Sequence, residues 1–534
     1  MSLKMRRNRR LPTKAARRSA GFVARSKGLL LWTGLVLSLA PFGFNCHSRT
    51  DLTPTSISHD QQDSEDQTVR AMASLDSIEK DGAPAGEAKV RIGSDALLSA
   101  SEAKVSGLMG KLSSAEDSLV KKGTSLVAVY DNACRGKQDA VLQIEAEAKV
   151  LQDDTSLAAL NAELEADKCL LRVDENQIMH LIQPLPDEIT SSFASQSEDQ
   201  VQALATVNDP RATEARHITF SKALAAWDWF FSDAAINSTQ LANDVIVAVI
   251  DTGILHTHPD LVENRYLSAT NSNGFDFVNN DNDPTDDNGH GTHVAGIVGA
   301  RANNGVGVTG VMGTRVKLMG IKVLAADGSG GIPAIVNGIR YAADNGAHVI
   351  NMSLGGRGAT TALRDAMNYA ASRGVVVVVA AGNDNALMDA GNNFYSPSGY
   401  SRDVPGAISV GSVDAVSGAR SSFSNYGTNY VWIGAPGSNG ILSTYTGNGY
   451  NAIQGTSMAS PVVAGAAALL VGAYRARGIA YTPADVVNLL TDSARPVTAL
   501  NNFFRNGATL DIERAARLFF SRHVLAGTAA TEAF

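Results

Sequence analysis

The sequence predicts an α/β protein whose main body is a doubly wound, mostly parallel sheet, preceded by a smaller α+β unit. The main observation is a series of continuous apolar runs of strand length, at 244–251, 317–324, 348–354, 375–382 and 407–413. Such runs are typical of strands that are buried on both faces of a parallel sheet. Helical or small-residue segments lie between them, at 292–301, 332–346 and 361–374. Strands that alternate with helices in this way build a sheet with helices on both faces.

Length and composition are those of a globular chain with room for more than one folded region. Of the 534 residues, 44% are apolar and 18% are charged. The formal net charge is −8, but residues 1–28 contain ten Lys and Arg and no acid. A chain cut near residue 45 therefore keeps 35 basic and 53 acidic residues, a net charge of −18. This acidic body argues against nucleic acid as a partner.

The first 45 residues have the features of an export signal. A basic stretch precedes an apolar run at 29–40, which is too short to span a bilayer comfortably. We expect residues 1–45 to be a signal peptide and the protein to be extracellular or in the cell envelope, with a retained anchor as the alternative. Cys46 follows the apolar run, as in a bacterial lipoprotein, although residues 43–45 depart from the usual small-residue pattern. A membrane contact is therefore expected only through the signal peptide or a lipid anchor at Cys46.

A small α+β unit is expected before the main body. Residues 46–120 are rich in Ser, Asp, Glu, Ala and Gly and predict a polar linker, and the unit itself is expected over 121–186. The patterns predict strands at 124–131 and 168–173, and helices at 137–154 and 156–167.

Two of the three cysteines, Cys134 and Cys169, belong to this unit. They have no CxxC pattern and no histidine neighbour, so they do not predict a metal site. In an exported chain they form either one disulfide or two free thiols, and the sequence leaves both open.

The rest of the chain divides into three parts. Residues 187–215 are polar and suit a linker that a protease can cut. The α/β domain is expected over 216–522, followed by a C-terminal tail at 523–534.

A serine, a histidine and an aspartate stand in motifs that fit nucleophilic catalysis. Ser457, in GTSMASP, opens a small-residue helix, where free N–H groups and the helix dipole favour negative charge on a substrate oxygen. A serine needs a base, and the base needs an orienting acid. His290 begins HGTHVAG, and Asp251 ends a predicted strand in DTG. Each motif alone is usually a cap or a turn, but their combination predicts a triad.

Together with AAGN at 380–383, these motifs resemble those of the subtilisin-like serine proteases, the subtilases. The resemblance runs from about residue 244 to about residue 518. It implies that Ser457 is the nucleophile, His290 the general base and Asp251 the acid that orients it. It also implies that the Asn383 side-chain amide and the Ser457 N–H bind the oxyanion. A polypeptide is then the expected substrate, and no cofactor is needed for the chemistry.

The resemblance also assigns roles outside the triad. Ser353, Leu354 and Gly355 would pair with the substrate backbone, and Gly355 with Gly356 would open the main specificity pocket. Residues 121–186 stand where the family has its inhibitory propeptide, so an autoprocessed zymogen inhibited by its own propeptide is expected. An unrelated accessory domain is the alternative.

The loop at 274–291 is rich in oxygen donors that suit calcium. Its carboxylates would repel one another without a cation. The loop resembles the calcium loop that some subtilases carry before the catalytic histidine. The carboxylates are Asp276, Asp281, Asp283, Asp286 and Asp287, and the expected ligands are Asp276, Asp281, Asp283, Thr285 and Asp287. A solvated acidic turn is the alternative.

Two other functional classes fit less well. A binding protein on an inactive subtilase scaffold would lack one of the four catalytic residues, and none is missing. An aspartic protease needs two carboxylates that share a proton, whereas the chain has a single DTG.

Overall fold

The computed structural model describes residues 88–91, 125–130, 140–146, 170–175, 177–186, 207–237, 244–389, 393–505 and 507–525. The expected signal peptide, Cys46, Cys134 and Cys169 lie outside the described residues, as does most of the expected tail. The expectations about export, lipid anchoring and disulfide pairing therefore stay predictions.

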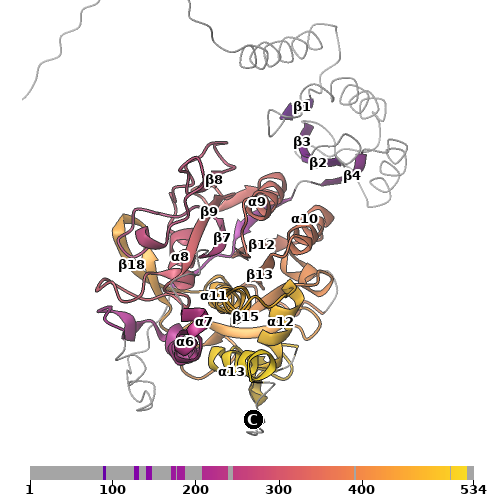
Figure 1. Cartoon of the computed structure of the whole chain (residues 1–534). Helices are drawn as coiled ribbons and strands as arrows, with labels where there is room; N and C mark the ends of the chain where they lie inside the picture. The colour runs from indigo at the N-terminus through magenta and orange to yellow at the C-terminus, as the bar shows by residue number, and fades with distance from the viewer. Residues whose placement is uncertain are drawn as a thin grey trace, which may run out of the picture. The chain divides into compact units, whose positions relative to one another are not determined.

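A nine-stranded sheet forms the centre of the main body, in the order β19-β20-β16-β15-β13-β11-β7-β9-β8 (Figure 1). All its neighbouring strands pair in parallel except β19 with β20. The expected strands are confirmed as β7, β9, β11, β13 and β15. The bounds are β7 Val245–Asp251, β8 Gly274–Asp276, β9 Val316–Lys322, β11 Val349–Met352, β13 Val376–Ala380, β15 Ala407–Asp414, β16 Ile433–Ser438, β19 Arg495–Pro496 and β20 Ala508–Thr509.

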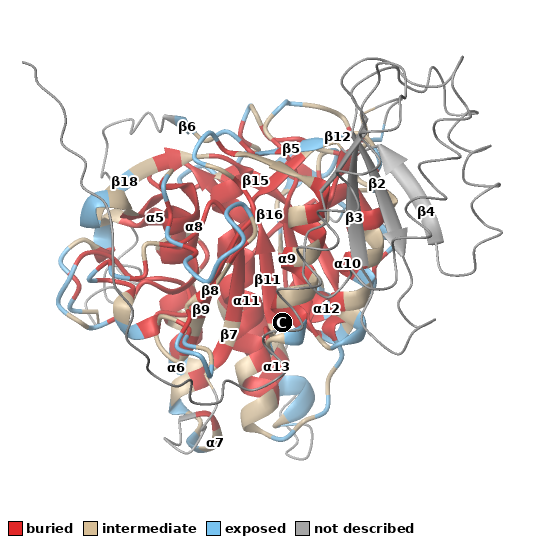
Figure 2. Ribbon diagram, turned by 90° about the horizontal axis from the view of Figure 1, so that it is seen from above, coloured by how far each residue is buried: buried red, intermediate tan, exposed pale blue. Residues whose placement is uncertain are grey.

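Helices cover both faces of this sheet, so the doubly wound α/β fold is confirmed. Val247 and Val249 of β7 belong to the core formed with α8 and α11, whereas Ala248 and Ile250 belong to the core formed with α9 and α10. Figure 2 shows the sheet strands as the most buried part of the molecule. The helices are α5 Arg216–Phe220, α6 Ala223–Ser232, α7 Ala234–Asn237, α8 His290–Gly299, α9 Ile332–Asp344, α10 Thr361–Ser372, α11 Thr456–Ala476, α12 Pro483–Asp492 and α13 Ile512–His523.

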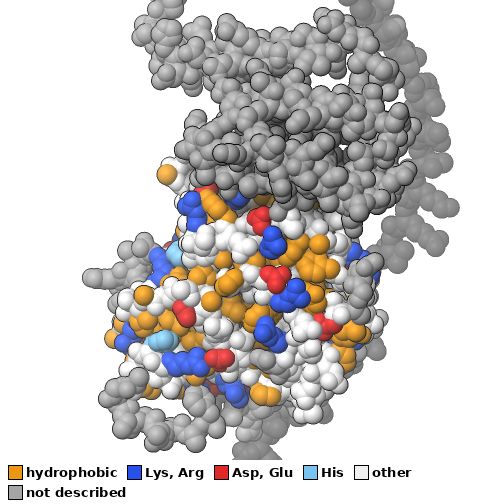
Figure 3. Space-filling view, turned by 90° about the vertical axis from the view of Figure 1, so that its right-hand side faces the viewer, with side chains coloured by type: hydrophobic (Ala, Val, Ile, Leu, Met, Phe, Trp, Pro, Cys, Tyr) orange, Lys and Arg blue, Asp and Glu red, His pale blue; other side chains and the backbone are white. Residues whose placement is uncertain are grey.

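The long helix α11 runs through the core. It is the one helix among the described residues that is long and apolar enough to cross a membrane, and 94% of its most apolar window is buried inside the protein. Its apolar surface therefore packs in the core. Pro461 lies inside this helix, beyond its first turn, so it has no N–H to donate to the carbonyl oxygen of Ser457, which accepts from Ser353 Oγ instead. On the face seen in Figure 3, basic and acidic side chains are interspersed over the described surface.

Four strands of the N-terminal part form an antiparallel sheet in the order β1-β3-β2-β4. β2 and β4 confirm the two expected strands. The helix predicted over 137–154 is wrong for its first half, which forms β3, and β1 lies inside the expected polar linker. Both strands are set by pairing with distant segments, which local periodicity does not report. The bounds are β1 Ala88–Arg91, β2 Ser125–Tyr130, β3 Ala140–Ala146 and β4 Leu170–Glu175.

The segment that follows this unit contributes one strand to each of two smaller sheets. β5 lies between β10 and β12, and β12 also pairs with β14. β6 pairs with β18, which pairs with β17. The bounds are β5 Ile178–Leu181, β6 Leu185–Pro186, β10 Ser329–Gly331, β12 Leu354–Arg357, β14 Tyr395–Ser396, β17 Leu442–Tyr445 and β18 Gly449–Gln454.

The main body begins earlier than expected. A short 3₁₀ helix at Ala212–Glu214 lies in the region predicted as a linker, and both Ala212 and Ala215 are buried. The Asp209 carboxylate accepts hydrogen bonds from the N–H groups of Asn303, Asn304 and Gly305. The polar composition of this stretch serves such contacts, so the boundary at residue 216 was too late.

Candidate active site

Asp251 and His290 form a hydrogen-bonded pair shielded from solvent. Asp251 is the last residue of β7, and His290 is the first residue of α8. His290 Nδ1 lies 2.7 Å from Asp251 Oδ1, and the two side chains are 1% and 0% exposed. When Nδ1 donates to the carboxylate, Nε2 is left as the acceptor that a general base needs. The pair therefore has the geometry of a base and its orienting acid.

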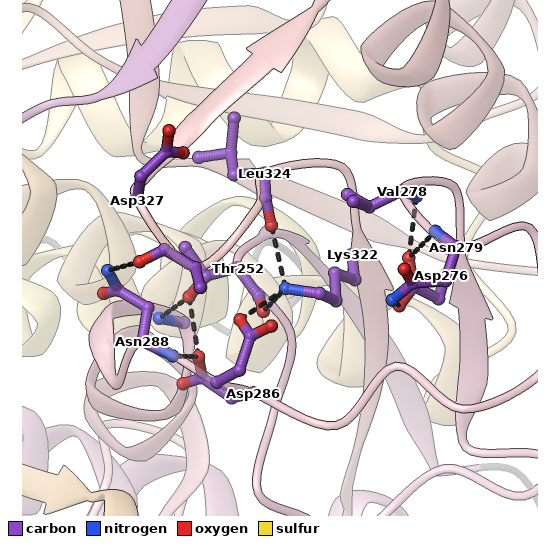
Figure 4. Close-up of polar contacts among 12 residues, drawn as sticks. Thr252, Asp276, Val278, Asn279, Asp286, Asn288, Lys322, Leu324 and Asp327 are labelled. Atoms are coloured by element: carbon purple, nitrogen blue, oxygen red, sulfur yellow. Dashed lines mark hydrogen bonds and ion pairs between the residues drawn. The ribbon is translucent and has the colours of Figure 1, made fainter.

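The start of α8 is held against the end of β7 by the Asp286 carboxylate (Figure 4). One oxygen accepts from Thr252 Oγ1 at 2.9 Å and from the N–H groups of Asn288 and Gly289 at 3.0 and 2.9 Å. The other accepts from the N–H and Oγ1 of Thr292 at 2.9 and 2.6 Å. These bonds satisfy donors that a helix start leaves without partners. One carboxylate thus joins the two elements that carry the base and the acid.

The close approach of α8 to β7 requires a glycine at position 291. A Cβ atom there would lie 2.1 Å from the carbonyl oxygen of Gly253 and 3.2 Å from Cβ of Asp251. Any side chain would push His290 away from its partner.

Ser457 lies in the first turn of α11 and is fully buried. Its backbone oxygen accepts from Ser353 Oγ at 2.9 Å. Ser353 Oγ in turn accepts from Asn351 Nδ2 at 3.0 Å, and Asn351 Oδ1 accepts from Ser460 Oγ at 2.7 Å. This chain of hydrogen bonds fixes the start of α11 against the carboxyl end of β11, where a parallel α/β sheet places its binding site.

Asn383 lies beside the same helix start. Its Oδ1 accepts hydrogen bonds from the N–H and Oγ1 of Thr456, both at 2.9 Å. Because the oxygen is held in this way, the Nδ2 group turns outward, and it donates to the carbonyl oxygen of Gln183 at 2.9 Å. The Asn383 amide is thus oriented as a donor toward a peptide carbonyl.

The segment 353–356, expected to bind the substrate, contacts an extended segment of the chain itself. Leu354 pairs with Leu181 and Gly355 with His180, in antiparallel register. A Cβ atom on Gly356 would lie 3.0 Å from Sδ of the buried Met179. The absence of a side chain at Gly356 therefore leaves room for that methionine.

The expected calcium ligands do not converge on one point. No group of three or more His, Cys, Asp or Glu side chains in the described part of the chain is placed to hold a metal ion. The buried Asp276 accepts from the N–H groups of Val278 and Asn279 (Figure 4). Asp287 instead forms an ion pair with the buried Lys322 at 2.6 Å. Asp287 therefore has a protein cation as its partner, which the sequence analysis did not foresee.

Asp281, Asp283 and Thr285 remain as exposed oxygen donors at alternate positions of this loop. Asp281 Oδ1 accepts from the N–H of Asp283 at 2.9 Å, and Asp283 Oδ1 accepts from Thr285 Oγ1 at 2.5 Å. The premise that the whole loop needs a cation is therefore too strong, because several of its carboxylates have protein donors.

Sequence reasoning missed the residues that hold the candidate catalytic side chains in place. Thr252 and Asp286 join α8 to β7, and Thr456 orients Asn383. Thr252 and Thr456 are sequence neighbours of Asp251 and Ser457, and this position beside predicted site residues was the sequence feature that could have identified them. Asp286 was grouped with the carboxylates of the predicted calcium loop, because the sequence does not show which N–H and O–H groups donate hydrogen bonds to it.

Comparisons with known proteins agree with this geometry. The model of the subtilase family, Peptidase_S8, matches residues 242–507. A thermophilic serine proteinase from Bacillus sp. (strain AK1) is 41% identical over 52% of this chain and 63% of its own length. Thermitase from Thermoactinomyces vulgaris is 45% identical over 42% of this chain and 74% of its own length. Subtilisin DY from Bacillus licheniformis is 41% identical over 51% of this chain and 91% of its own length. The chain thus covers just under two thirds of the first relative and more of the other two, and it belongs to the subtilase family of subtilisin-like serine proteases.

Proposed function

We propose that the chain is the zymogen of an exported serine endopeptidase that hydrolyses peptide bonds through an acyl-enzyme intermediate. One observation carries this proposal: Ser457 Oγ and Asn383 Nδ2 each hydrogen-bond, at 2.9 Å, to a carbonyl oxygen of one extended peptide segment. The nucleophile and the oxyanion donor thus already contact neighbouring peptide carbonyls. Membership of the family supports the same activity.

Each residue of the site has one part in the chemistry. Ser457 Oγ attacks the carbonyl carbon of the scissile bond while His290 Nε2 takes its proton, and Asp251 stabilises the charged imidazole. The Asn383 amide and the Ser457 N–H stabilise the oxyanion. His290 then gives the proton to the leaving amine, and water releases the acyl group from Ser457.

The zymogen part of the proposal assigns residues 121–186 as the inhibitor and the stretch before the main body as the processing region. It is supported by the position of β5 and β6, which pair with β10, β12 and β18 around the site. The test is the N-terminal sequence and mass of the protein from its native source. A mature form that still contains residues 121–186 and is fully active would exclude the inhibitory role. The same measurement decides signal cleavage and lipidation of Cys46.

Replacing Asn383 with alanine should lower kcat by about 10²–10³-fold, the loss known for the equivalent donor in subtilisin, and leave KM nearly unchanged. The reason is that the amide is held by Thr456 for a charge that develops only in the transition state. Steady-state kinetics on a peptide substrate measures the two constants separately. Asn383→Asp is the matched variant, since it keeps the oxygen that accepts from Thr456 but loses the donor. An unchanged kcat in both variants would show that another group stabilises the oxyanion.

We also propose that the loop at 274–291 binds calcium as a structural ion through the exposed donors Asp281, Asp283 and Thr285, with Asp276 in support. A chelator should then lower the unfolding temperature of the Ser457→Ala chain and speed autolysis within 276–287 in the active enzyme, because the exposed carboxylates of Asp281 and Asp283 would lose the ion that neutralises them. Asp281→Asn should remove most of the chelator effect, and Asp403→Asn, an exposed carboxylate elsewhere, should not. If elemental analysis finds no calcium and the unfolding temperature does not respond to chelator, the loop is a solvated acidic turn and not a calcium site.

A further inference from the structure

The residues 177–186, named here the strap, lie along the active site in an extended conformation. On one side of Ser457, β5 is the middle strand between β10 and β12. On the other side, Leu185 pairs with Gln454 and Pro186 with Ile453 of β18. The strap is therefore anchored by backbone pairing at both ends of the site.

Ile182 occupies the place of the residue before a cut. Its N–H donates to the carbonyl oxygen of Ser353 at 3.2 Å, and the preceding N–H, of Leu181, donates to the carbonyl oxygen of Gly328 at 2.7 Å. The Ile182 side chain is 3% exposed and packs in a cluster with Ala380 and Tyr395. An enclosed apolar side chain and a backbone register of this kind are what a bound substrate needs.

The reaction centre, however, is split between two peptide units. Ser457 Oγ donates to the carbonyl oxygen of Ile182 at 2.9 Å, whereas Asn383 Nδ2 donates to the carbonyl oxygen of Gln183 at 2.9 Å. In a reactive complex the carbonyl that the serine attacks is the same carbonyl that the oxyanion donors polarise. Neither the Ile182–Gln183 bond nor the Gln183–Pro184 bond meets both conditions.

The hydrogen bonding of the nucleophile points to the same conclusion. Ser457 Oγ has one proton, and its hydrogen-bond partners are the carbonyl oxygens of Ile182 at 2.9 Å and Ser353 at 3.3 Å. His290 Nε2 is buried and has no hydrogen-bond partner among the described residues. The bond between nucleophile and base that starts the reaction is therefore not made while the strap is in place.

Pro184 explains why the strap stays in this register. Its ring fixes φ and limits Gln183 to extended conformations, so the Gln183 carbonyl cannot rotate freely away from Asn383. The ring also places a carbon instead of a hydrogen on the nitrogen of the Gln183–Pro184 bond, next to the lone pair that His290 has to protonate. We propose that Pro184 locks the strap in an uncleavable register, so that the strap blocks the active site without being cut. This inference rests on the proposed protease function and on the inhibitory role of residues 121–186.

Replacing Pro184 with alanine should allow the enzyme to cut the strap. With alanine at position 184, the Ile182 carbonyl can replace that of Gln183 beside Asn383. Ser457 Oγ then bonds to the Ile182 carbonyl carbon, His290 carries the serine proton to the Gln183 nitrogen, and the Ile182–Gln183 bond breaks. Water afterwards releases Ser457 and leaves a carboxylate on Ile182. Activation of the natural chain therefore needs a cut outside the strap.

The experiment compares full-length chains that are refolded and followed by mass spectrometry. We expect Pro184→Ala to be cut after Ile182 about 10²-fold faster than the natural chain, the size of effect that a misplacement of about 1 Å has on a reacting pair. Pro186→Ala is the matched control, since it removes the other proline of the strap and leaves the Gln183–Pro184 unit intact. The double variant Ser457→Ala, Pro184→Ala should stay uncut. Equal cleavage after Ile182 in the natural chain and in Pro184→Ala overturns the proposal.

A synthetic peptide of residues 177–188 separates this inference from the proposed function. Added to the active enzyme, it should inhibit competitively and remain intact, whereas the same peptide with alanine at 184 should be consumed. A peptide that does not inhibit at all contradicts the inhibitory role itself. A peptide that inhibits but is cut as fast as its alanine form contradicts only the lock at Pro184. The peptide assay also tests the proposal if the Pro184→Ala chain does not fold.

Discussion

The Ser457→Ala variant should hydrolyse no detectable casein or peptide substrate, with a loss in kcat near the 10⁶-fold value known for the nucleophile of subtilisin. Ser457 is placed to attack a carbonyl, since its Oγ already lies 2.9 Å from a carbonyl oxygen of the strap. The variant should fold normally, since it removes a single oxygen, whose hydrogen bonds go to carbonyls at the cleft. Casein hydrolysis and thermal unfolding measure the two expectations.

A second serine provides the control for this experiment. Ser493 is also buried, and its hydroxyl bonds only to carbonyls of the helix that it ends. Ser493→Ala should therefore keep its activity. A serine-directed phosphonylating reagent should label Ser457 in the natural chain and nothing in the Ser457→Ala chain. Residual proteolysis by a homogeneous Ser457→Ala preparation would show that another residue is the nucleophile.

The second large effect should be a loss of stability in mild acid. Burial lowers the pKa of His217 and of His293 to about 3, and that of His256 and of His348 to about 4. Each is therefore neutral in the folded protein but gains a proton near its ordinary pKa of 6.5 when unfolded. Their stabilising contribution is complete above about pH 6.5 and is lost as the pH falls. At pH 5 the loss is about 2 kcal/mol for each histidine.

Two buried carboxylates act in the opposite direction. Burial raises the pKa of Asp260 to about 6, and it also raises the pKa of Asp209. Their charged forms are disfavoured in the folded protein, so stability rises as the pH falls through the raised pKa. For Asp260 the gain at pH 5 is about 1 kcal/mol. With four histidines the net change from pH 7 to pH 5 remains a loss of about 6 kcal/mol, a large part of the total stability of a typical domain.

Denaturant unfolding of the Ser457→Ala chain at pH 7 and pH 5 measures this loss without self-digestion. His217→Leu is the informative variant, because both ring nitrogens of His217 are buried without a hydrogen-bond partner among the described residues. It should reduce the pH dependence by about one third, since about 2 of the net 6 kcal/mol disappears. A free energy of unfolding that is the same at both pH values contradicts the assignment of these histidines as neutral.

The sequence predicted the parts of the fold that depend on local pattern. The apolar runs that became β7, β9, β11, β13 and β15 are long and uninterrupted, so burial on both faces was evident. The residues proposed as catalytic could be named from the sequence because each lies in a motif at the end of a strand or the start of a helix.

What could not be predicted depends on contacts between distant residues. The segment that forms β3 has helical composition, but pairing with β1 and β2 determines its conformation. Asp287 is one of several similar aspartates, and only the fold brings Lys322 to it. The split between the Ile182 and Gln183 carbonyls is a matter of register across the cleft, which no local pattern encodes.

The position of Ser457 on the central core helix has a consequence for how activity is lost. α11 packs within the main core together with strands β7, β13 and β15 and helices α8 and α12. The nucleophile cannot be withdrawn by fraying of a peripheral loop, because its helix separates from the sheet only when the core itself opens. Inactivation on heating should therefore coincide with cooperative unfolding of the main body, and turnover can serve as a direct readout of the fraction of folded molecules.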